Sequence, residues 1–351
     1  MHKQYLLAAL EQAESGRGLC SPNPSVGAVV VVEGKIIAKD YHHAAGSAHA
    51  EARILAQLVS QTPDAILYVT LEPCNHWGKT PPCVDAIINQ GIKTVVFGYR
   101  DPNPAVMKND TPAILARHGV KAIFYPLPEI DAFYESYEYW CVHKRPFITA
   151  KIAQTLDSKI ANPDGSPCQI SNEACHHFTH QQRLKTDLIL TSAKTILCDN
   201  PSFTARLNGM VYDKNIAILD RNLSLNLSEK VFQQAKQCYV YHAQGKKPKK
   251  SAKRVDYQKV REYNDRLALD EVINHLGQLG FHDVWVEAGA QVFQALHLAG
   301  LVNRSYIYIA PKLLGAEAPS AFLSDCFNEQ QKKTIHWLVM GDNCVLRLDW
   351  R

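Results

Sequence analysis

The sequence contains no hydrophobic run long enough to cross a membrane. Its apolar stretches stay below the roughly 18 residues that a membrane-spanning helix needs. Residues 1–5 run directly into a helical pattern and show neither the basic start nor the apolar centre of a secretory signal. These absences argue against a membrane protein and against a secreted one. We therefore expect a cytoplasmic protein with no membrane partner.

A large excess of charge of one sign is also missing. The 38 Lys and Arg residues nearly balance the 34 Asp and Glu residues, which leaves a formal net charge of +4. Binding to nucleic acid rests on a concentrated basic surface, and so small an excess does not indicate one. We therefore expect no nucleic-acid partner.

The cysteines lack the regular spacing of a disulfide framework. Ten of them are spread irregularly over 351 residues, whereas small secreted domains carry closely spaced cysteines that pair with one another. The irregular spacing favours reduced thiols in a reducing compartment. Such thiols remain available to bind a metal.

The length of the chain predicts two domains. A chain of 351 residues exceeds what one hydrophobic core usually accommodates. The polar segment His143-Lys144-Arg145-Pro146 is the expected boundary, which gives domains at 1–145 and 146–351. Just before it, Phe133, Tyr137 and Trp140 form an aromatic stripe on an expected helix, and we interpret this stripe as packing between the domains.

One constellation in the first half carries recognisable chemistry. His49-Ala50-Glu51 is followed by Glu72-Pro73-Cys74 and by Pro81-Pro82-Cys83. One histidine and two cysteines occupy three corners of a zinc tetrahedron and leave the fourth for water, whose pKa the metal lowers. Glu51 is the non-ligand carboxylate that can carry a proton from water to a leaving nitrogen. The pattern predicts a zinc-dependent deaminase.

Two alternatives remain open for these residues. The cysteines can be buried without metal, or the site can be a structural zinc site with His76 as its fourth ligand. Neither alternative explains a glutamate two residues past the histidine. The eight residues between Cys74 and Cys83 also exceed the two of a Cys-x-x-Cys pair, which points to a different substrate within the deaminase class.

Buried strand patterns alternate with helical patterns along both halves. Residues 26–32, 66–71 and 94–99 are apolar runs rich in β-branched residues, and helical patterns lie between them. This alternation predicts an α/β fold with helices on both faces of a sheet, where ligands bind at the carboxyl ends of the strands. Asn23 lies in a proline-rich turn before the first of these strands, where capping of the turn and contact with substrate are equally plausible roles.

The motifs resemble those of the bifunctional riboflavin-biosynthesis deaminase/reductase family. The similar segments are Pro22-Asn23-Pro24-x-Val26-Gly27, His49-Ala50-Glu51, Thr70-Leu71-Glu72-Pro73-Cys74, Gly78-Lys79-Thr80-Pro81-Pro82-Cys83 and Asp101-Pro102-Asn103-Pro104. The resemblance implies a cytidine-deaminase-like three-layer domain followed by a dihydrofolate-reductase-like domain. It also implies two reactions, deamination of a pyrimidine ribose phosphate and reduction of its ribosyl group to ribityl with NADPH.

The resemblance also assigns roles to residues of the first half. It implies that His49, Cys74 and Cys83 bind Zn²⁺ and that Glu51 is catalytic. It places the following residues around the base and the ribose phosphate: Asn23, His42, His76, Lys79, Asp101 and Asn103. This chain departs from the family pattern at Asn75, where serine is common, and at residues 107–110, where a glycine-rich turn is usual.

The second half resembles the family's reductase domain. The resemblance places Ala153, Thr195, Asp199 and Gly289 against NADPH, and Lys151, Arg183, Arg206 and Glu287 against the substrate. Arg206 suits a phosphate because a guanidinium binds one in bidentate fashion. The resemblance further implies a homo-oligomer formed through the reductase domain.

Four departures bear on whether this half is active. Ser158 stands where the family usually has glycine, Pro167 and Gln169 replace a serine and a tryptophan, and Arg221 replaces a small residue. Loss of the tryptophan removes apolar area that a flat cofactor would use. The first alternative is therefore an active deaminase beside a C-terminal scaffold. A second is a nucleic-acid deaminase, which requires a basic stripe beside the zinc site.

Overall fold

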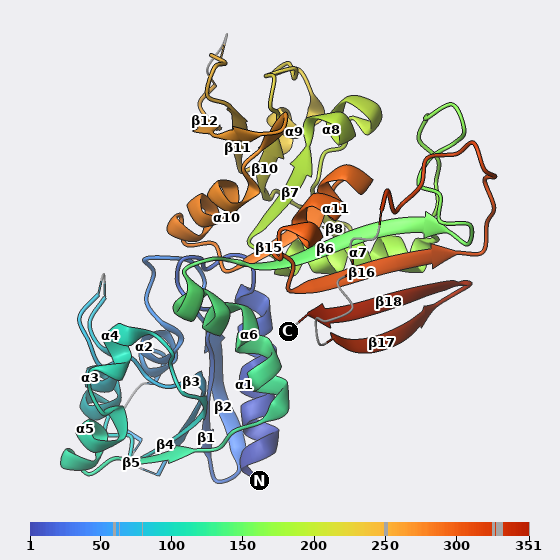
Figure 1. Ribbon diagram of the computed structural model, residues 1–351. Coiled ribbons are helices and arrows are strands. Elements are labelled where there is room, and N and C mark those ends of the chain that lie inside the picture. The colour runs from blue at the N-terminus through green and yellow to red at the C-terminus, as the bar shows by residue number, and fades with distance from the viewer. Residues whose placement is uncertain are drawn as a thin grey trace. The chain divides into compact units, whose positions relative to one another are not determined.

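The computed structural model describes residues 1–58, 61–62, 64–78, 80–248, 252–324, 327 and 333–350 (Figure 1). The chain divides into two compact units, Met1–Arg145 and Pro146–Arg351. Among the described residues, no helix has both the length and the apolar character that crossing a membrane requires.

The first unit is a five-stranded sheet between two layers of helices (Figure 1). Its elements are α1 (His2–Gly16), β1 (Gly27–Val32), β2 (Lys35–Tyr41), α2 (Ala50–Leu55), β3 (Ile66–Leu71), α3 (Cys83–Asn89), β4 (Thr94–Tyr99), α4 (Pro104–Met107), α5 (Thr111–Arg117), β5 (Lys121–Phe124) and α6 (Pro128–His143). The strand order is β2-β1-β3-β4-β5. β1 is antiparallel to both of its neighbours, whereas β3, β4 and β5 are parallel. Helices α1 and α6 cover one face, and α2, α3 and α5 cover the other.

Helix α1 packs against the sheet so closely that one strand position requires glycine. A Cβ atom at Gly27 would collide with the Ala9 carbonyl oxygen and the Ala13 backbone nitrogen of α1. The four residues that follow Gly27 are buried on both faces, as expected of a strand between two helical layers. The glycine of the Pro-Asn-Pro-x-Val-Gly motif therefore has a packing role.

The aromatic stripe of α6 belongs to the core of the first unit. Phe133 and Tyr137 are buried there with Tyr134, and Trp140 packs against the same cluster. Our interpretation of this stripe as packing between domains was wrong. The periodicity showed that one helix face is apolar, but it could not show that the sheet of the same unit covers that face.

The second unit is built on a nine-stranded sheet. Its elements are β6 (Phe147–Thr155), α7 (Glu173–Lys185), β7 (Leu188–Ser192), α8 (Ala193–Asp199), β8 (Ala205–Leu207), β9 (Met210–Tyr212), β10 (Asn215–Leu219), α9 (Lys230–Gln234), β11 (Gln237–Ala243), β12 (Val255–Val260), β13 (Glu262–Tyr263), β14 (Arg266–Leu267), α10 (Leu269–Gln278), β15 (Asp283–Glu287), α11 (Ala290–Leu298), β16 (Arg304–Ala310), β17 (Lys333–Met340) and β18 (Asn343–Trp350). The strand order is β12-β11-β10-β7-β15-β6-β16-β18-β17. Seven strands are parallel, and β18 and β17 add an antiparallel edge.

Two hydrophobic clusters line the opposite faces of this sheet. Residues of α10 and α11, such as Ile273 and Phe293, fill one cluster. Residues of α7, α8 and α9, such as Cys175 and Ile196, fill the other. The central strands are buried on both sides, as in Leu188–Ser192, where all five residues are buried and the first three are apolar. The expected α/β fold with helices on both faces is confirmed.

Candidate active sites

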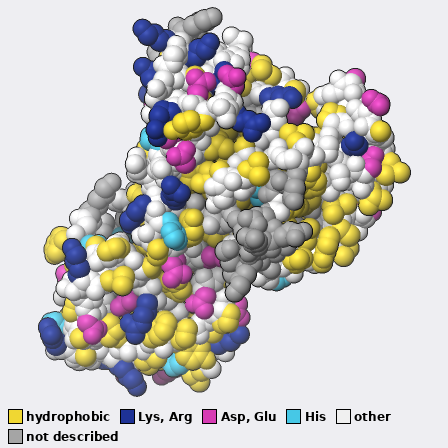
Figure 2. All heavy atoms as spheres, in the orientation of Figure 1, with side chains coloured by type: hydrophobic (Ala, Val, Ile, Leu, Met, Phe, Trp, Pro, Cys, Tyr) yellow, Lys and Arg dark blue, Asp and Glu magenta, His cyan; other side chains and the backbone are white. Residues whose placement is uncertain are grey.

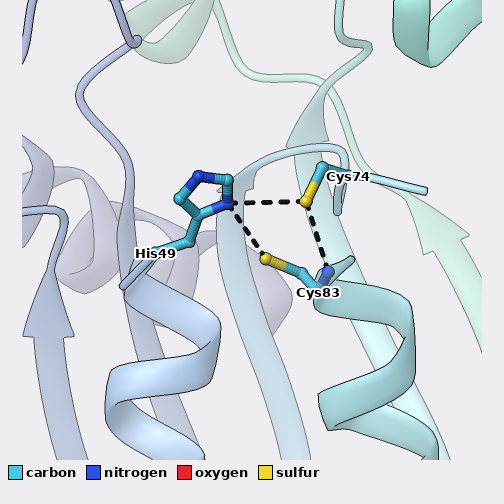
Figure 3. Close-up of side chains that lie close together, drawn as sticks. All are labelled: His49, Cys74 and Cys83. Carbon is cyan, nitrogen blue, oxygen red and sulfur yellow. Dashed lines mark hydrogen bonds between the residues drawn. The ribbon is translucent and has the colours of Figure 1, made fainter. Parts of the chain in front are cut away.

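His49, Cys74 and Cys83 lie together in the first unit (Figure 3). The His49 Nδ1 atom is 3.4 Å from the Cys74 Sγ atom and 3.3 Å from the Cys83 Sγ atom. The backbone N–H of Cys83 donates a hydrogen bond of 3.2 Å to the Cys74 sulfur. The imidazole therefore presents its Nδ1 edge to both thiols.

The topology explains why these residues meet. β3 and β4 are parallel neighbours, with Leu71 beside Tyr99 at their carboxyl ends. The segments after those strands, which carry Cys74 and Asp101, therefore leave the sheet at the same edge. His49 is the N-cap of α2 and Cys83 is the first residue of α3. Two helix N-termini thus face this edge, where their dipoles favour thiolates.

The donor set fits zinc. Tetrahedral zinc with its usual bond lengths places a nitrogen and a sulfur ligand about 3.5 Å apart, close to the distances found between His49 and each cysteine. Among the residues that the structure describes, these three form the group suited to a metal, and His76 is not part of it. Three protein ligands are typical of catalytic zinc, whereas a structural site closes with four.

Glu51 is buried beside the three ligands. Burial, reinforced by the negative charge of Cys74, raises the pKa of the Glu51 carboxyl to about 7. Cys74 behaves in the opposite way: a hydrogen bond from the Cys83 side chain, together with His49, outweighs burial and lowers the pKa of Cys74 to about 4. A thiolate ligand and a carboxyl group that exchanges protons near neutral pH therefore stand side by side.

The threonine of the Thr-Pro-Pro-Cys segment holds the far side of the histidine ring. The Thr80 Oγ1 atom lies 3.4 Å from the His49 Nε2 atom. A proton on Nε2 leaves the lone pair on Nδ1, which faces the two sulfurs. Thr80 thus contacts the nitrogen of His49 that faces away from the two cysteines. Contacts of this kind orient metal-binding histidines. Thr80 belongs to the Gly78–Cys83 motif, but no role was predicted for it, because its contact with His49 joins residues 31 positions apart.

Two further residues from the sequence analysis pair with each other near the histidine. His42 is buried, and burial lowers its pKa. Its Nδ1 atom contacts the Ala48 carbonyl at 3.3 Å and its Nε2 atom contacts the Asn23 amide at 3.3 Å. The His42 ring lies edge-on to the His49 ring, with centroids 5.3 Å apart. Asn23 therefore holds a neutral histidine beside the metal ligand.

The loop between the two cysteines is described in part. The His76 Nδ1 atom is buried and has no hydrogen-bond partner in the part of the chain that the structure describes. The prediction for Lys79 falls outside the described residues. Asp101 and Asn103 follow β4: Asp101 is buried, and the Asn103 side chain caps α4 by accepting from the Ala105 N–H at 3.0 Å.

Two departures from the family pattern turn out to be joined. The Asn75 amide donates to the Val106 and Asn109 carbonyls at 3.1 and 3.2 Å and to the Thr111 hydroxyl at 2.7 Å. These bonds bind the residue after Cys74 to the segment 107–110 and its flanks. A serine at this position is too short to reach three such partners. Asn75 and the altered turn therefore form one hydrogen-bond network.

In the second unit, a buried ion pair joins two of the predicted substrate residues. Arg183 of α7 donates from Nε and Nη2 to Glu287 at the end of β15, at 2.6 and 2.8 Å, and from Nη1 to the Thr204 carbonyl at 3.0 Å. The Trp285 indole donates to the same carboxylate at 2.8 Å. Burial opposes ionisation of Glu287, but the charge and hydrogen bonds of Arg183 outweigh it and lower its pKa to about 2.

The other two predicted substrate residues lie on either side of this pair. Lys151 of β6 is paired with Glu287 of β15 in the sheet register, and its ammonium group lies 5.0 Å from the centre of the Tyr308 ring. Arg206 is exposed on β8, and its backbone N–H donates to the His180 ring at 3.1 Å. His180 of α7 therefore holds Arg206 on β8, and Arg183 of α7 holds Thr204 just before that strand.

The predicted cofactor residues lie on α8, on β6 and at the start of α11. Gly289 is the N-cap of α11, which has no side-chain cap, and a Cβ atom there would meet nothing within 4 Å. Open space at an uncapped helix N-terminus fits a phosphate of NADPH. Thr195 lies in the first turn of α8, where its hydroxyl contacts Ser192 at 3.1 Å. Asp199 ends α8, and Ala153 lies in β6 beside Tyr308 of β16.

Comparison with known proteins identifies the family to which the chain belongs. Residues 1–99 match the cytidine and deoxycytidylate deaminase zinc-binding region, and residues 146–346 match the RibD C-terminal domain. The riboflavin biosynthesis protein RibD of Aquifex aeolicus is 35% identical over 317 residues, which cover 89% of this chain and 88% of that protein. The chain belongs to the RibD family.

Further relatives share this RibD organisation along the whole chain. The RibD protein of Escherichia coli K12 is 31% identical over 331 residues, 90% of this chain and 89% of its own. A Thermotoga maritima structure is described as a diaminohydroxyphosphoribosylaminopyrimidine deaminase/5-amino-6-(5-phosphoribosylamino)uracil reductase. It is 30% identical, covers 100% of this chain and 99% of that one, and has a TM-score of 0.86.

Membership of the RibD family establishes the general function. The protein is a bifunctional enzyme of riboflavin biosynthesis, with a zinc-binding deaminase domain and a reductase domain that uses NADPH. The predicted fold class and bifunctional activity are confirmed. The alternative of a C-terminal scaffold is not favoured, because that half matches the RibD C-terminal domain. Figure 2 shows Lys and Arg interspersed with acidic side chains on the face in view, and nothing indicates a nucleic-acid partner.

The structure also shows the surroundings of the four positions that depart from RibD patterns in the reductase half. Ser158 adopts a φ of 59°, the left-handed conformation that glycine adopts without strain. Arg221 is held by Glu262 and Asp265 of the β13–β14 hairpin, at 2.5 and 2.6 Å. The Gln169 carbonyl accepts from Lys312 at 2.6 Å. The Pro167 carbonyl accepts from the Asn162 amide at 3.3 Å.

Proposed function

We propose that the first unit deaminates 2,5-diamino-6-ribosylamino-4(3H)-pyrimidinone 5′-phosphate and that the second unit reduces the ribosyl group of the product to ribityl. The printed description of the Thermotoga maritima relative names a deaminase and a reductase for substrates of this class. The observation that carries the first assignment is the joint position of His49, Cys74 and Cys83 beside the buried Glu51.

In the deamination, His49, Cys74 and Cys83 hold zinc. When bound there, zinc supplies a Lewis acid that lowers the pKa of water to near neutrality. Glu51 accepts a proton from water and delivers it to the leaving amino group. A carboxyl group with a pKa of about 7 suits both directions of this transfer, because it changes its protonation state near working pH.

The base and the ribose phosphate are bound by the polar residues around this centre. We assign this role to Asn23, His42, His76, Lys79, Asp101 and Asn103. The Nδ1 atom of His76 has no hydrogen-bond partner among the described residues, which supports its inclusion, since a substrate group can satisfy a buried polar atom.

In the reductase, Arg183 and Arg206 bind the substrate phosphate. A guanidinium carries five N–H donors, and in Arg183 three of them contact Glu287 and the Thr204 carbonyl. One N–H on Nη1 and one on Nη2 are left for contact with phosphate. Glu287 and Lys151 then contact the ribosyl group.

Ala153, Thr195, Asp199 and Gly289 would hold the cofactor. NADPH supplies the hydride when it is bound. The uncapped N-terminus of α11 at Gly289 donates backbone N–H groups to a phosphate of the cofactor. The buried Arg183–Glu287 pair keeps the substrate side of the site ordered before either molecule binds.

The protein self-associates through its second unit. Strand β17 is an edge strand, and its Ile335, Trp337 and Val339 side chains alternate on one face and are 51%, 62% and 81% exposed. An exposed apolar face on an unpaired edge favours a second copy of the chain, which would cover it. We place the protein in the cytoplasm, where a reducing environment keeps free thiols such as Cys74 and Cys83 reduced.

Substitution of the proton carrier tests the deaminase assignment. Glu51→Gln is expected to retain zinc and to lose ammonia release by a factor of about 10²–10⁴. The same preparation should still oxidise NADPH when it is given the deaminated intermediate. Glu11→Gln, an exposed glutamate of α1, is the matched control and should retain both activities. Substantial ammonia release from Glu51→Gln, or no saturable NADPH binding, would contradict the proposal.

A further inference from the structure

The Asp101 carboxylate is held at one of its two oxygens. The Tyr137 hydroxyl donates to Oδ1 at 3.1 Å, and the backbone N–H of Asn103 donates to the same atom at 2.9 Å. Within the described part of the chain, Oδ2 has no hydrogen-bond partner. The carboxylate is therefore fixed through one oxygen, and its second oxygen is available.

Asp101 occupies a position that disfavours a negative charge. It is buried, and the charges of Glu72 and Cys74 act on it. Burial is the main reason that its pKa is raised to about 6. A carboxylate in such a place needs donors to hold its charge and orientation. In the described part of the chain, two donors contact the Asp101 carboxylate, and the Tyr137 hydroxyl is one of them.

The simplest alternative is that Tyr137 is a core tyrosine whose hydroxyl needs any partner. Two other buried tyrosines of this unit satisfy that need with a backbone carbonyl: Tyr134 donates to Ser25 at 3.0 Å and Tyr5 to Gly34 at 2.7 Å. The Tyr137 hydroxyl instead donates to the Asp101 carboxylate, whose negative charge acts on His49.

We propose that Tyr137 is a positioning residue of the deaminase. It holds Oδ1 of Asp101 and so presents Oδ2 to accept a hydrogen bond from an amino group of the pyrimidine. This inference rests on the proposed role of Asp101 in substrate binding. Tyr137 itself acts through Asp101 and does not contact the substrate.

The test is a single-atom change, Tyr137→Phe, in the full-length zinc enzyme. The Michaelis constant for the diaminopyrimidine substrate should rise about tenfold with kcat nearly unchanged, because the lost bond orients a binding group. Tyr5→Phe removes the hydroxyl of α1 that donates to the Gly34 carbonyl. It should lower the melting temperature and leave the Michaelis constant unchanged. Zinc content near one ion per chain shows that the first unit is folded in each variant.

A double-mutant cycle with Asp101→Asn separates this inference from the proposed function. If Tyr137 acts through Asp101, Tyr137→Phe has little further effect once Asp101 is replaced. An unchanged Michaelis constant in Tyr137→Phe, or an equal effect in both backgrounds, overturns the inference. An unchanged Michaelis constant in Asp101→Asn instead overturns the substrate role of Asp101.

Discussion

Arg183 and Glu287 form a buried, two-pronged ion pair between residues 104 positions apart. Both hydrogen bonds are short, at 2.6 and 2.8 Å, and both side chains are largely shielded from solvent. The pair joins α7 to the carboxyl end of β15. Gly289, the N-cap of α11, follows Glu287 by two residues. The pair therefore connects α7, whose Arg183 is proposed to bind the substrate phosphate, to the proposed cofactor site at Gly289.

Removing one partner of this pair should cost far more stability than removing both. Arg183→Ala leaves Glu287 buried without its counter-charge, so we expect a loss of about 3–5 kcal/mol in the free energy of unfolding. Arg183→Met with Glu287→Met should lose much less. Thermal unfolding of the second unit measures both. As a control, Arg221→Ala, which breaks an exposed pair, should change stability far less, because solvent screens exposed ion pairs. Equal losses at Arg183 and Arg221 would refute this account.

Asn75 should support zinc binding although it is not a ligand. Asn75→Ala removes the three contacts that the side chain donates and the one that it accepts from Asn109. We expect zinc affinity to fall about 10–100-fold, the usual effect of losing an outer partner of a metal site. Competition with a chelator measures the affinity. Asn109→Ala, which removes one bond of 3.4 Å, is the control and should have little effect. Unchanged affinity in Asn75→Ala would show that the network is dispensable.

Ser158→Gly should stabilise the second unit. Ser158 has a φ of 59°, and a residue with a side chain adopts this conformation at a cost of about 1–2 kcal/mol. Glycine removes that strain but loses about 0.5–1 kcal/mol through the entropy of the unfolded chain. We expect a net gain of up to about 1 kcal/mol, measured as a higher melting temperature. Ser228→Gly, at an exposed position without a positive φ, should be neutral or slightly destabilising; a gain of equal size there would contradict the explanation.

Lys214 should make stability increase with pH in the alkaline range. It is buried and donates to the Leu184 carbonyl at 3.1 Å. Burial lowers its pKa to about 8, whereas a lysine in an unfolded chain titrates near ~10.4. Between these values the unfolded chain binds more protons at Lys214 than the folded chain does, so the contribution of Lys214 to the free energy of unfolding rises with pH.

Comparison with Lys214→Met isolates this effect. The stability difference between the natural protein and the variant should shift by about 2–3 kcal/mol in favour of the natural protein as the pH rises through this window. Denaturant unfolding of the second unit at several pH values measures it. Lys230→Met, at an exposed lysine, should give a difference that does not change with pH. A constant difference for Lys214→Met would show that Lys214 titrates normally.

Strands buried on both faces could be located from the sequence. Residues 66–71 and 94–99 were predicted with the bounds that the structure gives, because a strand covered by helices on both sides is rich in apolar residues. Strands β12, β17 and β18 were not predicted. They lie at or near the edges of the sheet and mix polar with apolar residues, as in Val255–Val260, and their place is decided by the neighbouring strand to which they bond.

The sequence by itself determined the chemistry, because residue type and local spacing decide which atoms can hold zinc and which carboxylate can carry a proton. It could select His49, Cys74, Cys83 and Glu51 without knowing where they lie. Only the tertiary structure decided the contacts between distant segments, such as Tyr137 with Asp101. Helical periodicity shows that a face is buried, but hydrogen-bond partners depend on how the chain returns, and pairwise geometry of that kind leaves no local pattern in the sequence.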